Sequence, residues 1–94
     1  MRPAEAIVWA RKDLALRRTS ATYDALAWAL HLNGDADEAR ASIERALATG
    51  AKEPHLLMHA AAILGRAGEH ERSAQLLLEA HRRSPLLREF HVHH

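Results

Sequence analysis

Apolar residues recur along the chain at intervals of three and four positions, a spacing typical of one buried face of an α-helix. Proline, glycine and capping residues divide this pattern into segments of similar length. Pro3 suits the first turn of the first helix, and Thr19 or Ser20 is suited to cap the second. The pattern predicts helices over residues 3–17, 21–32, 36–48, 54–66 and 70–83, and a short helix from Ser84-Pro85.

The joints between these segments are short, so neighbouring helices are expected to pack antiparallel. Asn33-Gly34, Gly50 and Gly68 supply the stops, and Asp35 followed three residues later by Glu38 predicts a capping box. Alanine and leucine dominate the composition, whereas valine, isoleucine and threonine are scarce. The sequence therefore predicts an all-α fold in one domain.

A 34-residue period relates the two central helix pairs. Gly34 recurs as Gly68, Ala27 as Ala61, and Ala46 as Ala80. The alanines are small at positions where paired helices approach closely, and the glycines permit a positive φ at the turn. A helix–turn–helix unit of this length indicates an array of stacked repeats.

The residues at these positions resemble the tetratricopeptide repeat family. Tyr23-x-x-Leu26-Ala27-x-x-Leu30 and Ala39-x-x-x-Ile43-x-x-Ala46 match its two helices, and Leu57-x-x-Ala60-Ala61-x-x-Leu64 with Ser73-x-x-x-Leu77-x-x-Ala80 repeats the match. Residues 23–50 read like small bacterial members of the family. The resemblance implies a helical-repeat solenoid with a half repeat at 1–19, full repeats at 20–53 and 54–87, and a tail at 88–94. Leu30, Leu57 and Ala51 depart from the family's usual aromatic and proline residues.

Members of that family usually bind peptides or proteins in a groove lined by the first helix of each pair. The resemblance therefore implies a non-catalytic scaffold with a protein or peptide partner. The groove residues it implies are Asp24, Trp28, His31, His55, Met58, Ala62 and Arg66. An alternative role for Trp28 is simple packing over Ala62, and we favour this packing role because buried aromatic side chains dominate core energetics.

A second candidate surface is the uncovered side of the first helix. Val8, Trp9 and Leu16 lie off the stripe of Ile7, Ala10 and Leu14, and Trp9 and Leu16 are seven residues apart. We expect them to form an exposed strip for homodimerisation or for docking on a larger protein. At the other end, the prediction is that Leu86, Leu87 and Phe90 fold back as a cap.

Histidine clusters suggest an alternative, a small zinc- or nickel-binding accessory protein. His55 and His59 share a helical face, and His91, His93 and His94 cluster near the end of the sequence, either as native residues or as a tag remnant. A metal site needs three or four ligands, and nothing in the sequence brings the two groups together. A third alternative is a fragment of a longer repeat protein or a designed repeat.

Composition argues against several other functions. The net charge is +1 with both signs interspersed, which is unlike a nucleic-acid-binding surface. No apolar run reaches the about 20 residues that span a bilayer, and the start lacks a signal-peptide pattern, so the default expectation is a cytoplasmic protein. There is no cysteine, no phosphate-binding glycine loop and no nucleophile motif. We expect no enzyme activity and no cofactor.

Overall fold

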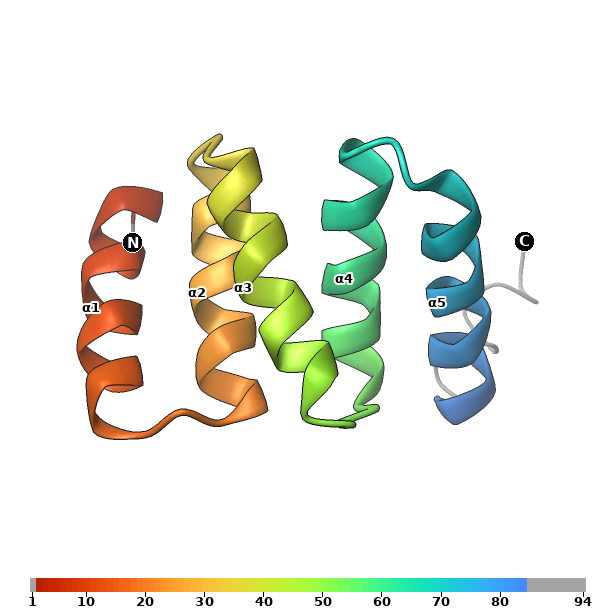
Figure 1. Cartoon of the computed structure of the whole chain (residues 1–94), viewed down its shortest axis with the longest axis horizontal. Coiled ribbons are helices and arrows are strands. Elements are labelled where there is room, and N and C mark those ends of the chain that lie inside the picture. Colours follow the sequence, from red (N-terminus) through yellow and green to blue (C-terminus); the bar gives the residue numbers. More distant parts are fainter. Residues whose placement is uncertain (1, 85–94) are drawn as a thin grey trace.

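The computed structural model describes residues 2–84, and all regular structure within them is helical (Figure 1). The five helices are α1 (Pro3–Leu16), α2 (Ser20–Leu32), α3 (Ala36–Ala48), α4 (Pro54–Arg66) and α5 (His70–Arg83). Their bounds agree with the predicted segments to within one residue, which confirms the all-α fold class. None of them has both the length and the apolar character that crossing a membrane requires. The predicted helix after Ser84 and the cap formed by Leu86, Leu87 and Phe90 lie outside the described residues.

Local hydrogen bonds explain where the helices begin. The Thr19 hydroxyl accepts from the backbone N–H of Thr22 at 3.2 Å, and the Thr22 hydroxyl accepts from that of Thr19 at 2.9 Å. This reciprocal pair is the capping box of α2, and it shows that Thr19 is the cap. The capping box predicted at Asp35 is wrong, because the Asp35 carboxylate caps no backbone N–H and instead accepts from the Asn33 side chain at 3.0 Å.

The turns that follow α2 and α4 are built alike. Gly34 has a φ of +89° and Gly68 a φ of +91°, the left-handed conformation that glycine adopts without strain. The N–H of the next residue then donates back to the helix, from Asp35 to the Leu30 carbonyl and from Glu69 to the Leu64 carbonyl, both at 2.9 Å. The two turns lie 34 residues apart, as do the starts of α2 at residue 20 and α4 at residue 54.

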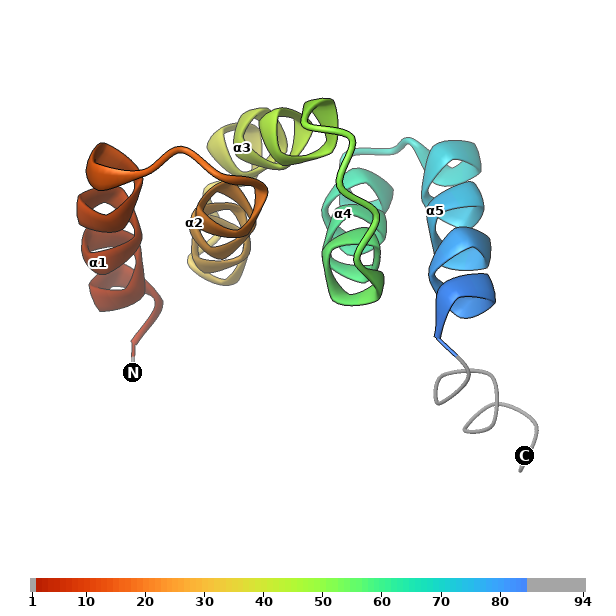
Figure 2. The same ribbon diagram turned by 90° about the horizontal axis from the view of Figure 1, so that it is seen from below.

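Consecutive helices pack against each other and alternate in direction, as predicted (Figure 1). The α2 and α4 helices also pack together, and they run in the same direction. Seen from below, α3 lies on one side of a row formed by α1, α2, α4 and α5 (Figure 2). The side of this row that faces away from α3 is consequently not covered by any helix of the described chain.

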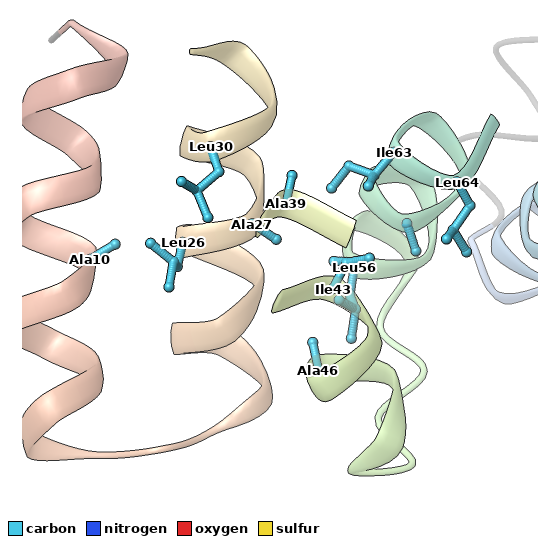
Figure 3. Close-up of a cluster of buried hydrophobic side chains, with 11 residues drawn as sticks. Ala10, Leu26, Ala27, Leu30, Ala39, Ile43, Ala46, Leu56, Ile63 and Leu64 are labelled. Carbon is cyan, nitrogen blue, oxygen red and sulfur yellow. The ribbon is translucent and has the colours of Figure 1, made fainter. Parts of the chain in front are cut away.

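The core lies between α2, α3 and α4 and extends to Ala10 of α1 (Figure 3). Four leucine and isoleucine side chains are its largest fully buried members: Leu30, Ile43, Leu56 and Leu64. The four small residues of the 34-residue period are all buried, as expected from their role at close helix approaches: Ala27, Ala46, Ala61 and Ala80.

Candidate partner-binding face

Two hollows open on the side of the molecule that faces away from α3. The larger has a volume of about 500 Å³ and lies between α2, α4 and α5; the smaller, of about 430 Å³, lies between α1, α2 and α4. No residue of α3 lines either of them. They share three aromatic rings, those of Trp28, His55 and His59, which therefore form a ridge between the two hollows.

A buried carboxylate holds this ridge in place. Asp24 is 5% exposed, and its Oδ1 lies 2.8 Å from Nδ1 of His59 across the α2–α4 contact. An ionised carboxylate only accepts hydrogen bonds, so His59 donates the proton on its Nδ1 in this pair. Nε2 of His55 lies farther away, 3.8 Å from the other Asp24 oxygen, and that side chain is mostly exposed.

The indole of Trp28 lies between two imidazoles. Its ring centroid is 4.1 Å from that of His59 with an interplanar angle of 15°, and 5.0 Å from that of His31 with an angle of 28°. His31 follows Trp28 by three positions on α2, whereas His59 comes from α4 and is fixed by Asp24. The stack therefore joins the two parallel helices and limits the freedom of Trp28 before any partner binds.

Partial burial and neighbouring positive charges lower the pKa of His31. Burial lowers the pKa of its imidazole most strongly, and the charges of Arg66 and His59 lower it further. Arg66 is exposed in the last turn of α4, and no carboxylate lies within ion-pair distance of it among residues 2–84. Among the described residues, this end of the face consequently carries the positive charge of Arg66 without a carboxylate partner, close to the His31 ring.

The structure brings together most of the predicted groove residues. Trp28, His55, Met58 and Ala62 line the larger hollow together, and Met58 is 37% exposed. Asp24 lies in the wall of the smaller hollow with its carboxylate bonded to His59. His31 belongs to the ring stack, whereas Arg66 lines neither hollow.

Sequence reasoning missed three contributors to this face. The sequence predicts His59 only as a metal ligand, whereas in the structure its main partners are Asp24 and Trp28. Ser73 and Leu77, four residues apart on α5, complete the larger hollow. The Ser73 hydroxyl donates to the Ala61 carbonyl at 2.7 Å. The four-residue spacing on α5 was a usable signal, but the pairing of Asp24 with His59 depends on how α2 packs on α4.

The described residues contain only two of the predicted metal ligands, His55 and His59. His55 and His59 are neighbours, with ring centroids 6.1 Å apart in an edge arrangement. Across residues 2–84, no group of three or more histidine, cysteine, aspartate or glutamate side chains is arranged to hold a metal ion. The other predicted cluster, His91, His93 and His94, lies outside the described residues.

The predicted edge on α1 is open to solvent. Val8 is 52% exposed, Trp9 61% and Leu16 84%. A hollow of about 630 Å³ adjoins Trp9 and Leu16 and extends to Ala25 of α2. The Lys12 ammonium lies 4.9 Å from the centroid of the Trp9 ring, within range of a cation–π interaction.

Comparison with known proteins identifies no relative of this chain. No protein-family model matches the chain, and no curated protein and no solved structure matches it significantly.

Proposed function

We propose that this protein is a non-catalytic interaction module whose face of α2, α4 and α5 binds a peptide or a helix of a partner protein. On this proposal the two helix pairs are tetratricopeptide-type repeats, and the face opposite α3 is the concave side of the stack. The 34-residue period, the matching turns at Gly34 and Gly68, and the parallel α2 and α4 support this assignment.

The observation that carries the proposal is the larger hollow and its composition. Its walls are mainly apolar, from Met58, Ala61, Ala62 and Leu77, and the ring of Trp28 stands at its side. Apolar hollows with a few fixed polar groups are the usual sites for anchoring side chains of a partner. The imidazoles of His55 and His59 supply those polar groups here.

The positions of the polar groups favour binding over catalysis. The Nδ1 proton of His59 is directed to Asp24, which gives this ring the fixed orientation seen in many functional sites. The nearest hydroxyl in the same hollow, that of Ser73, is directed to the Ala61 carbonyl instead. We therefore assign the Asp24–His59 pair the role of fixing the Trp28 ring, and Trp28, Met58 and Leu77 the role of contacting the partner.

Selection from a displayed peptide library, followed by affinity measurement on the selected peptides, tests this proposal. Two neighbouring leucines provide a matched pair of variants. Leu77 lines the hollow and is 39% exposed, whereas Leu78 is 56% exposed and does not line it. We expect Leu77→Glu to weaken binding at least about tenfold, because it places a charge in an apolar hollow, and Leu78→Glu to leave binding nearly unchanged.

Trp28→Ala provides a second check on the same peptides. It should weaken binding by a similar factor without unfolding the protein, which circular dichroism would verify. Peptides that bind both leucine variants and the Trp28 variant as tightly as wild type would contradict the assignment of this face.

A further inference from the structure

The outward side of α1 carries an apolar strip that includes two charged residues, Glu5 and Lys12. At 100° per residue, Glu5, Val8, Trp9, Lys12 and Leu16 fall within about 100° of the helix circumference. The buried Ala10 lies on the opposite side and packs towards α2. Within residues 2–84, α2 is the only helix that α1 packs against, so no described segment covers this strip.

The two charged residues of the strip differ from the other charges of α1. Arg11 pairs with Glu38 of α3 at 2.9 Å, and Asp13 pairs with Arg17 at 3.4 Å. Glu5 has no cation within ion-pair distance among the described residues. Lys12 lies over the Trp9 ring and has no carboxylate partner in the same part of the chain. One unpaired acid and one unpaired base thus stand seven positions apart, with Val8 and Trp9 between them.

We propose that a second copy of this chain covers the strip, with the two α1 helices antiparallel about a two-fold axis between Val8 and Trp9. In this register, Glu5 of each copy faces Lys12 of the other, and Val8 faces Trp9. A parallel arrangement would place Glu5 against Glu5 and Lys12 against Lys12, and such like-charge contacts are unfavourable. The antiparallel arrangement forms two opposite-charge contacts, one between Glu5 and Lys12 on each side of the two-fold axis, as a symmetric interface requires.

The size of the strip sets the strength of this contact. Stable interfaces commonly engage about 20–30 residues on each side, more than one helix of 14 residues provides. The dimer is therefore weak and forms at high micromolar concentration. The hollow beside Trp9 and Leu16 gives room for an apolar side chain of the second copy. Trp28, Met58 and Leu77 lie elsewhere, so this dimer does not depend on the proposed peptide-binding function.

Sedimentation velocity at low salt, over about 10 μM to about 1 mM protein, tests the proposal through charge reversal. Glu5→Lys and Lys12→Glu each create two like-charge contacts in the dimer. We expect either substitution alone to weaken association about tenfold. The double variant restores opposite charges in the same register, and its association constant should return to within about threefold of wild type.

Controls separate this contact from general charge effects and from misfolding. Glu71→Lys changes the net charge by the same amount as Glu5→Lys but lies on α5, and it should leave the association unchanged. All three substituted side chains are exposed, so each variant should retain its helical circular dichroism. A wild type that stays monomeric at 1 mM would overturn the proposal, and so would a double variant as weak as the single ones.

Discussion

The carboxylate of Asp24 is buried between α2 and α4, and a ring nitrogen of His59 is its hydrogen-bond partner there. Loss of one partner would leave the other desolvated and unpaired, which costs more than the bond itself contributes. We expect Asp24→Ala to lower the free energy of unfolding by about 1–3 kcal/mol. In a double-mutant cycle with His59→Ala, measured by urea unfolding, the coupling energy should be at least about 1 kcal/mol.

His55→Ala is the matched control for this cycle. His55 shares the helix face and lies near the same carboxylate, but its side chain is 67% exposed and its Nε2 is 3.8 Å from Asp24. Its coupling to Asp24 should remain below about 0.5 kcal/mol, in the range of exposed ion pairs. Equal coupling for the two histidines would show that the pair with His59 does not hold the ridge.

Helix α3 is tied to α5 by ion pairs that do not involve the apolar core. Arg72 donates to both carboxylate oxygens of Glu44, at 2.7 and 2.6 Å, and this bond is the main reason that the pKa of Glu44 lies below its ordinary value of 4.5. The same guanidinium lies 3.8 Å from Glu69, which is also paired with Arg40. The network thus brings together side chains of two helices that belong to successive pairs.

The lowered pKa of Glu44 makes this contribution to stability pH-dependent. The folded state holds the carboxylate in its ionised form, so the stabilisation is fully present above pH 4.5 and is lost as the pH falls through the lower folded value. Because both side chains are more than one-third exposed, we expect Glu44→Gln to cost only about 0.5–1 kcal/mol at pH 7. Urea unfolding should show the difference in unfolding free energy between Glu44→Gln and wild type shrinking below pH 4.5.

A difference that stayed constant as the pH fell below 4.5 would contradict the ion-pair explanation. Added salt provides an independent check, because screening weakens a partly exposed pair. The difference between Glu44→Gln and wild type at pH 7 should therefore be smaller at 1 M salt than at 0.1 M.

The bounds of these helices were readable from the sequence because strong local signals mark them. Pro54 fixes the first turn of α4, and glycines with positive φ end α2 and α4. The predicted cap at Asp35 failed for a local and a non-local reason: the Asp35 carboxylate accepts from the Asn33 side chain, and Glu38 pairs with Arg11 of α1. Local patterns cannot anticipate such competition from another helix.

The candidate site was predictable only in part for the same physical reason. Helical spacing placed Trp28 and His31 on one face, and they stack as neighbours there. The contact of His59 with Asp24 and Trp28 joins residues more than thirty positions apart, and it depends on the parallel packing of α2 on α4. No spacing within a single helix determines how α2 and α4 are aligned along each other.

Burial is unevenly distributed along the stack, and this should appear as a gradient of stability. Six residues of α2 and six of α4 are buried, whereas α1 contributes a single buried residue, Ala10. Because α2 is the only one of the described helices on which α1 packs, α1 can detach while the remaining helices keep their core. We expect its amides to exchange with an opening free energy about 1–3 kcal/mol below that of α4.

Hydrogen exchange at two protein concentrations measures this gradient and relates it to self-association. In dilute protein, exchange of α1 amides at the same rate as α4 amides would show one cooperative unit and contradict the gradient. At high concentration the proposed dimer buries α1, so its exchange should slow with concentration while that of α4 stays constant. Glu5→Lys should reduce the concentration dependence but leave the gradient unchanged. The gradient follows from packing within one chain, whereas the slowing follows from contact between two chains.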